Sequence, residues 1–178
     1  MGWVPLYMYG IPIALFAISL TFTLVGAAQA QSNVHPMKKI RTEILIDAPI
    51  ETVWNVLIDR EAWPTWNPFI IESTQPLILG KRIRNVMRNG ARTLVFKPKI
   101  TDFQPYKRLE WLGHLGIPGL FDGRHSFELQ KLNGQTLLVQ GEYFGGMLRK
   151  PIMKKIGQQT LENFMAMNQA LKARCETR

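Results

Sequence analysis

Hydrophobic and polar residues alternate along much of the chain after residue 37, as in half-buried strands. In the segment IRTEILID, Ile40, Ile44 and Ile46 fall on one face, which predicts a strand. Asn-Gly pairs at 89–90 and 133–134 are strong signals for two-residue hairpin turns. Further strand-like runs span roughly 70–74, 82–88, 92–103, 108–115, 121–132 and 135–143. The pattern therefore predicts an antiparallel meander.

Two other segments have the spacing of amphipathic helices. PIETVWNVLID predicts a short helix, and Pro49 is well tolerated at its first position. A long helix is predicted at about 147–173, with Met153, Leu161 and Met165 beside an apolar stripe of Leu148, Ile152, Ile156, Thr160, Phe164, Met167 and Leu171. This order of elements is that of an α+β fold, and only the long helix can cover the apolar face of such a sheet.

The stretch AWPTWNPFI, residues 62–70, concentrates aromatic surface where Pro64 and Pro68 interrupt regular structure. Trp63 and Trp66 are three residues apart and would share one face of a helical turn. They can close one end of the gap between sheet and helix as a hydrophobic plug. They can also act as a ligand gate, to which Asn67 adds an amide. Both interpretations stay open at this point.

Residues 1–36 contain no Lys, Arg, Asp or Glu, and we treat them as an N-terminal hydrophobic segment ahead of a domain at 37–178. The uncharged stretch is long enough for a membrane anchor, which predicts membrane association. The small-x-small pattern at Ala28–Ala30 also fits a cleaved signal peptide, which would give a secreted or periplasmic protein. If Met37 is the true start, the protein would be cytoplasmic.

All 22 basic and 13 acidic residues lie from residue 37 onward, so the domain carries the whole net charge of +9 and favours anionic partners. Basic residues cluster at 81–88 and at the start of the long helix: Lys81, Arg82, Arg84 and Arg88, then Arg149, Lys150, Lys154 and Lys155. These clusters are either a solubilising surface or one attracted to anionic lipid headgroups. No nucleic-acid reader motif is present, so we expect no nucleic-acid partner.

The segments IRTEILIDAPIETVWNVLIDREAWPTWNPFI, RLEWLGHLGIPGLFDGRHSFEL and ENFMAMNQALKAR resemble the SRPBCC or START-like superfamily over about residues 38–174. That superfamily includes polyketide cyclases/dehydrases, lipid-transfer proteins and birch-pollen-allergen-like proteins. The resemblance implies a helix-grip fold: a curved antiparallel sheet of about six to seven strands around the C-terminal helix, with an apolar cavity between them. It implies no activity, because the superfamily holds binders, carriers and enzymes alike.

The chemistry of the chain favours binding over catalysis. The three histidines show no metal-ligand spacing, so we expect neither a metal nor another cofactor. Strand alternation places His125 among apolar residues, which makes it a structural histidine, a ligand contact or a general acid/base; Tyr143 and Glu142 are the other catalytic candidates. The candidate ligand-binding residues are Trp63, Trp66, Asn67, Arg92, Leu94, Phe96, Trp111, His125, Phe127 and Phe164.

We therefore expect the domain to bind or carry a small hydrophobic molecule that is lipid-like, isoprenoid-like or polyketide-like. The alternative is a cyclase or dehydratase that uses the acid/base candidates. A third possibility is a regulatory domain that binds a protein partner, which would have a filled core. The single cysteine, Cys175, excludes an intrachain disulfide.

Overall fold

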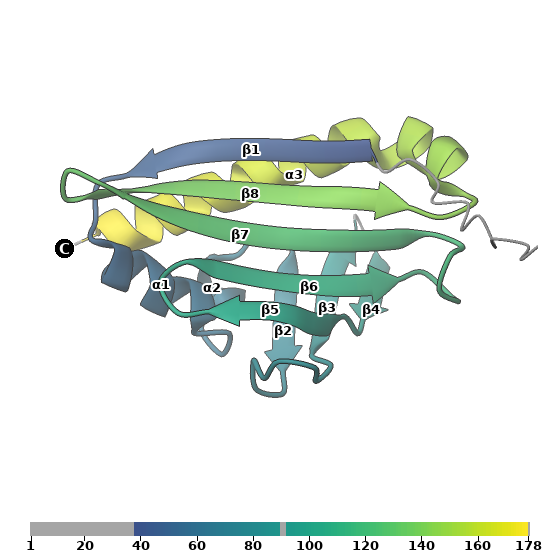
Figure 1. The fold of residues 1–178 in the computed structure, drawn as a ribbon, viewed down its shortest axis with the longest axis horizontal. Coiled ribbons are helices and arrows are strands. Elements are labelled where there is room, and N and C mark those ends of the chain that lie inside the picture. The colour runs from purple at the N-terminus through teal and green to yellow at the C-terminus, as the bar shows by residue number, and fades with distance from the viewer. Residues whose placement is uncertain (1–37, 90–91, 178) are drawn as a thin grey trace, which may run out of the picture. The chain divides into compact units, whose positions relative to one another are not determined.

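Eight strands and three helices occur in the part of the chain that the computed structural model describes, residues 38–89 and 92–177 (Figure 1). In chain order they are β1 (Lys38–Ile46), α1 (Ile50–Ile58), α2 (Trp63–Trp66), β2 (Ile70–Thr74), β3 (Arg84–Asn89), β4 (Arg92–Phe96), β5 (Lys99–Gln104), β6 (Arg108–His114), β7 (Asp122–Leu132), β8 (Gln135–Gly145) and α3 (Arg149–Glu176). The α+β class, the antiparallel pairing and the long C-terminal helix are confirmed. The N-terminal hydrophobic segment lies outside the described residues.

The strands form two antiparallel sheets: a five-stranded one in the order β1-β8-β7-β6-β5 and a three-stranded one in the order β2-β3-β4. The predicted single strand at 92–103 is wrong, because the chain leaves one sheet after Phe96 and joins the other at Lys99. Pro98 lies between them and lacks the N–H that a continuous ladder would use. The described strands therefore number eight rather than six or seven.

The predicted hairpins are present. β7 and β8 pair in register up to Leu132 and Gln135. Asn133 and Gly134 between them have φ angles of 48° and 86°, which are the positive values that a two-residue type I′ turn requires. β3 and β4 pair up to Asn89 and Arg92, so this hairpin is also present, but Asn89 is the last paired residue of β3 and the turn lies one residue later than the Asn-Gly pair predicts.

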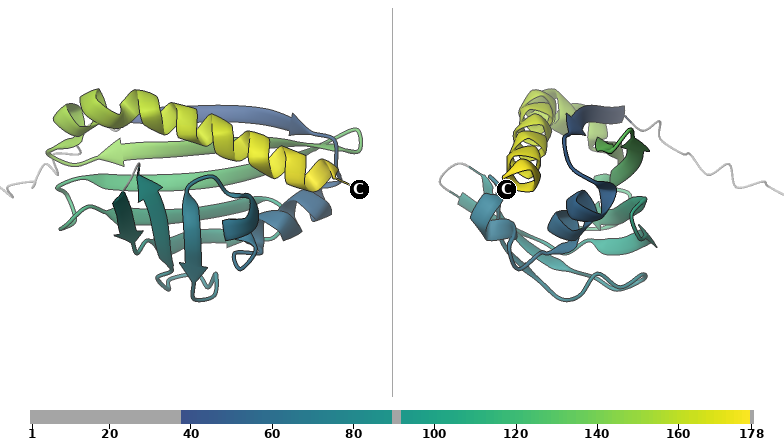
Figure 2. Two further views of the ribbon diagram at one scale, coloured as in Figure 1. Left: turned by 180° about the vertical axis from the view of Figure 1, so that it is seen from behind. Right: turned by 90° about the vertical axis from the view of Figure 1, so that its left-hand side faces the viewer.

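The three-stranded sheet crosses the long strands at a steep angle, and α3 runs along the same side of the five-stranded sheet (Figure 2). The core lies between these layers and is built largely from inward-facing aliphatic residues and Trp63. Fully buried members include Ile46, Leu57, Trp63, Ile83, Ile100, Leu109, Leu138 and Leu171. The arrangement is the expected one of a sheet wrapped around a terminal helix.

The predicted apolar stripe of α3 is correct only in its C-terminal half. Phe164, Met167 and Leu171 are buried, but Leu148 and Ile156 are exposed. The stripe was built from four-residue steps, each of which advances about 40° beyond a full turn of an α-helix. Leu148 therefore lies about 160° around the helix from Phe164 and cannot share its face. Among the described residues, no helix is both long and apolar enough to cross a membrane.

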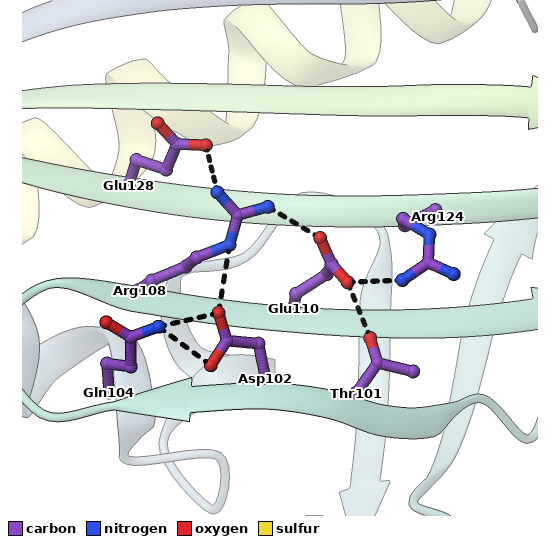
Figure 3. Close-up of polar contacts among 7 residues, drawn as sticks. All are labelled: Thr101, Asp102, Gln104, Arg108, Glu110, Arg124 and Glu128. Atoms are coloured by element: carbon purple, nitrogen blue, oxygen red, sulfur yellow. Dashed lines mark hydrogen bonds and ion pairs between the residues drawn. The ribbon is translucent and has the colours of Figure 1, made fainter.

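A network of charged residues covers the outer face of β5, β6 and β7 (Figure 3). Its centre is Glu110, which accepts hydrogen bonds from Arg108 at 2.6 Å, Arg124 at 2.7 Å and Thr101 at 2.8 Å. Burial by itself would raise the pKa of Glu110, but these hydrogen bonds and the charge of Arg124 outweigh burial and lower it. Glu110 is therefore ionised in the folded protein, and the network ties three neighbouring strands together.

Candidate functional site

A cavity of about 160 Å³ lies between the five-stranded sheet on one side and the three-stranded sheet with α3 on the other. Most of its lining is apolar or aromatic, with a few polar groups. The lining residues are Phe69, Ile70, Asn85, Met87, Phe96, Trp111, His125, Phe127, Gln140, Glu142, Thr160, Asn163, Phe164 and Met167. The domain is thus hollow beneath its terminal helix, where the sequence predicts an apolar cavity.

Aromatic rings enclose His125 at the wall of the cavity. Its imidazole stacks on Trp111, with ring centroids 4.8 Å apart and planes 7° from parallel. The ring of Phe164 on α3 packs edge-on against the imidazole, with centroids 4.8 Å apart. The ring of Phe127, two residues further along β7, also has its centroid 4.8 Å from that of the imidazole. These rings contact the imidazole of His125 from several sides and restrict its orientation. The imidazole lines the cavity in that orientation.

Two polar side chains of β8 hold the imidazole nitrogens of His125. Gln140 Nε2 lies 3.2 Å from Nε2 of the ring, and Glu142 Oε2 lies 3.3 Å from Nδ1. Since the amide nitrogen of Gln140 can only donate, Nε2 of the ring accepts, and Nδ1 carries the proton that Glu142 accepts. The carboxylate of Glu142 thus orients the imidazole of His125.

Gln140 leaves one polar atom of the cavity wall unused. Its side chain is fully buried, and its Oε1 has no hydrogen-bond partner among the described residues. A buried carbonyl oxygen without a partner costs about 1–3 kcal/mol. The site therefore contains an acceptor that a bound molecule can satisfy.

Asn85 supplies the complementary group from the three-stranded sheet. Its Oδ1 accepts a hydrogen bond from Ser73 at 2.7 Å, and Ser73 in turn accepts one from Arg60 at 3.0 Å. Burial lowers the pKa of Arg60, an effect that nearby Glu61 only partly offsets. With its oxygen engaged by this chain, Asn85 has its amide N–H groups left for the cavity.

Two glycines that pair with each other across β6 and β7 let side chains of the cavity wall pack closely against the sheet. A Cβ on Gly113 would lie 1.8 Å from the ring of Phe96, so the absence of a side chain allows β4 to pack its aromatic ring against β6. A Cβ on Gly123 would lie 2.2 Å from Oε1 of Glu142. Gly123 therefore leaves the space in which the carboxylate that orients His125 lies.

Several residues predicted from the sequence line the cavity: Phe96, Trp111, His125, Phe127, Phe164 and the acid/base candidate Glu142. They come from four different strands and α3, and the fold brings them together. Whether they bind a ligand remains a prediction.

Other predicted residues lie elsewhere. Trp63 is fully buried in the core, where its indole N–H donates to the Leu57 carbonyl at 2.9 Å, as a hydrophobic plug does. Trp66 is half-buried in a separate shallow groove beside Arg174. The placement of Leu94 at the cavity is wrong: although it pairs with the lining residue Met87, its side chain is exposed and borders a separate groove.

Two of the predicted polar contacts also lie outside the cavity. Tyr143 points away from it, is exposed, and has the ammonium of Lys39 over its ring at 5.0 Å. Asn67 is buried behind the wall, where its Oδ1 accepts the backbone N–H groups of Phe69 and Ile70 at 3.0 Å each. It thereby positions two lining residues. The side chain of Arg92 lies outside the described residues.

The sequence analysis missed eight lining residues: Phe69, Ile70, Asn85, Met87, Gln140, Thr160, Asn163 and Met167. The clearest signal for them was in β8, where Gln140 alternates with Leu138 and Phe144 on the same face as Glu142. No group of three or more metal-binding side chains occurs in the described part of the chain.

Comparison with known proteins identifies the class of this fold and then its family. The solved structures that resemble it include the Zhui aromatase/cyclase from Streptomyces sp. R1128, with a TM-score of 0.63, 16% identity and coverage of 80% of this chain and 95% of that one. A START superfamily protein from Mycobacterium smegmatis has a TM-score of 0.60, 23% identity and coverage of 78% and 97%. Ara h 8.0201 has a TM-score of 0.65, 11% identity and coverage of 80% and 99%.

Residues 37–176 match the family described as polyketide cyclase / dehydrase and lipid transport, and the chain belongs to that family. The resemblance stated from the sequence is thereby confirmed. The family and the cavity together define a fold for binding hydrophobic ligands. No curated protein matches the chain.

Proposed function

We propose that the domain binds a neutral, hydroxyl-bearing hydrophobic molecule, with a ring of the ligand in the aromatic cavity and its hydroxyl on Gln140. The unpartnered Oε1 of Gln140 carries this proposal, because it is a buried acceptor in a cavity that is otherwise almost entirely apolar. Asn85 provides a donor from the opposite sheet. A hydroxyl group donates and accepts at once, and so suits both.

The size of the cavity limits the ligand. A volume of about 160 Å³ is close to that of engineered protein cavities of about 150 Å³, which hold one benzene ring. An intact diacyl lipid does not fit inside. The enclosed part of the ligand is a single ring or a short isoprenoid unit, and any remainder leaves the cavity past the half-buried lining residues Thr160 and Asn163 of α3.

The energetics require the polar contacts. Burying about 200 Å² of a single ring at about 25 cal/mol per Å² gives about 5 kcal/mol. Association costs at least about 4 kcal/mol, so apolar contact alone leaves an affinity weaker than millimolar. A hydrogen bond to Gln140 and further apolar surface at the mouth of the cavity supply the rest.

The charged groups of the site determine whether neutral or anionic ligands bind better. Glu142 is the only carboxylate among the described lining residues, and the site has no lysine or arginine there. A carboxylate on the ligand would meet the charge of Glu142 in a poorly solvated cavity, which is unfavourable. Neutral phenols should therefore bind better than the matching benzoates.

Ligand-observed NMR with p-cresol, toluene and p-toluate tests these statements. We expect p-cresol to bind most tightly, toluene more weakly and p-toluate least. Thr160→Trp, which places an indole in the cavity mouth, should abolish p-cresol binding. Met165→Trp on the exposed face of the same helix is the control and should not change it. Absence of p-cresol binding, or equal loss in both variants, would contradict the proposal.

A second candidate function is catalysis of ring closure or dehydration in a polyketide-like substrate. The contact of His125 with Glu142 at 3.3 Å favours it, because an imidazole oriented by a carboxylate is suited to move a proton. A short poly-β-ketone is the test substrate, followed by mass spectrometry for the loss of one water. Turnover that His125→Gln removes while p-cresol still binds would establish the enzyme. Without turnover by the unmodified protein, this candidate is wrong.

A further inference from the structure

Large aliphatic side chains are exposed together at one end of the domain. Ile117 in the β6–β7 loop is 68% exposed and Met147 before α3 is 72% exposed. The two segments lie side by side, since the N–H groups of residues 147 and 148 donate to the carbonyls of residues 119 and 120 at 2.9 Å. We define the apolar tip as Leu115, Ile117, Met147 and Leu148. The β6–β7 loop and the connection from β8 to α3, which carry these residues, lie at the right-hand end of Figure 1.

The apolar tip is held outward by the fold beneath it. The β6–β7 loop is closed by a hydrogen bond from the N–H of Leu115 to the carbonyl of Phe121 at 2.9 Å. The ring of Phe121 stacks on Phe144 with centroids 5.7 Å apart, in a small core of its own with Met153 and Phe164. The tip is thus anchored by its base, while its own side chains remain in water at a cost in free energy.

Basic residues surround the apolar tip on α3. Arg149 and Lys150 lie in the first turn, and Lys154 and Lys155 lie in the next. No acidic residue occurs in the first turn, and none of the four makes an ion pair with a carboxylate in the described part of the chain. Cations at a helix N-terminus oppose the helix dipole, so this cluster is unfavourable without an anionic partner.

The described part of the chain begins at the same end of the domain. Residues 1–36 carry no charged side chain, and the described chain begins at Lys38. Lys38 pairs with Phe144, three residues before Met147. This end of the domain therefore carries the apolar tip, the basic cluster and the first residue of the described chain. The opposite end carries the exposed carboxylate of Asp59 and the Asp47–Glu176 contact.

We propose that this end of the domain docks on an anionic phospholipid bilayer, with the apolar tip in the interface and the basic cluster on the headgroups. Protruding aliphatic side chains need no complementary groove in a fluid bilayer, and each basic residue near an anionic surface adds attraction. The proposal rests on surface residues and is independent of what the cavity binds.

The full-length protein with Ile117→Cys, labelled with an environment-sensitive fluorophore, tests this docking. The native thiol does not compete, because burial of Cys175 raises its pKa to about 11. Vesicles of phosphatidylcholine alone, or mixed equally with phosphatidylglycerol, carry a quencher on the lipid chains. We expect strong quenching only with the anionic vesicles. Leu132→Cys, exposed at the opposite end of the domain, is the control and should remain unquenched.

Removal of two charges tests the role of the basic cluster. Lys154→Gln with Lys155→Gln should lower the ratio of inserted to free tip about 25-fold, since each basic residue contributes about fivefold. Lys107→Gln with Lys131→Gln, at the opposite end, should leave this ratio unchanged. Equal quenching in both vesicle types, or equal quenching at positions 117 and 132, would overturn the proposal. If the fluorophore at position 117 already reports an apolar environment before lipid is added, residues 1–36 or a second copy of the protein cover the apolar tip, and the proposal is also overturned.

Discussion

Replacing Gln140 tests whether the unused oxygen in the cavity belongs to the ligand. In Gln140→Met, a side chain of similar length replaces the amide. The folded protein loses an orphaned carbonyl oxygen, worth about 1–3 kcal/mol in stability. It also loses the donor to His125 Nε2, which then lacks a partner at a similar cost. The two effects nearly cancel, so we expect the stability of the unliganded protein to change by less than about 1 kcal/mol.

Ligand binding should change selectively. A hydrogen bond to a neutral group contributes about 0.5–1.5 kcal/mol net, so p-cresol should bind about 2- to 12-fold more weakly to Gln140→Met. Toluene has no hydroxyl and should bind as before. The binding free energies of p-cresol and toluene to the unmodified protein and to Gln140→Met form a double-mutant cycle, in which toluene lacks the ligand hydroxyl. The cycle separates the contribution of this hydrogen bond from changes in packing.

Asn168→Leu is the matched control. Asn168 is also buried, also donates through its amide nitrogen, here to Thr42 at 3.0 Å, and also has an orphaned oxygen, but it does not line the cavity. It should affect neither ligand. If p-cresol and toluene lose affinity equally in Gln140→Met, the residue acts through packing, and the assignment of its oxygen to the ligand is refuted.

The remaining predictions concern packing, acid stability and the thiol. Gly113→Ala should destabilise the domain by about 2 kcal/mol in urea denaturation, because the new methyl group displaces Phe96; an unchanged midpoint would contradict this close approach. Glu110→Gln should cost about 2 kcal/mol at neutral pH, because it weakens the contact with Arg108. The lowered pKa of Glu110 means that its contribution is complete above the unfolded-state pKa of about 4.3 and is lost as pH falls through the folded-state pKa. The difference between the two proteins should therefore shrink in acid, and a constant difference would show that the charge is not responsible. With a pKa of about 11, Cys175 should react with a thiol reagent at pH 8 only on unfolding, and rapid labelling of the folded protein would disprove its burial.

The alternation of side chains in β8 shows which features of the cavity can be predicted from the sequence. It correctly placed Gln140 and Glu142 on one face and Tyr143 on the other, but both faces carry large apolar residues. Which face is inward depends on the sheet and helix that pack against the strand. The pattern therefore does not distinguish Tyr143, which is exposed, from Gln140, which is buried at the cavity.

The contribution of the three-stranded sheet to the cavity is the second feature that the sequence does not predict. Nothing in the residue pattern of 92–103 except Pro98 indicates that one strand becomes two in different sheets. Asn85 and Met87 enter the cavity because β3 crosses the long strands, and a crossing angle is a tertiary property. By contrast, the Asn133-Gly134 turn and the start of α1 are local, and the sequence predicted them accurately.

The break at Lys97 and Pro98 has a consequence for the range of molecules that the cavity can admit. Near the break, the two sheets are fastened by hydrogen bonds of the backbone of residues 80–83 with that of residues 98–100. The far ends of β3 and β4 have no such link to the five-stranded sheet among the described strand pairings. A tilt of the three-stranded sheet about this fastened edge would widen the cavity and leave every strand ladder intact. Adaptation to a bulkier guest then costs side-chain contacts along one wall and no backbone hydrogen bonds.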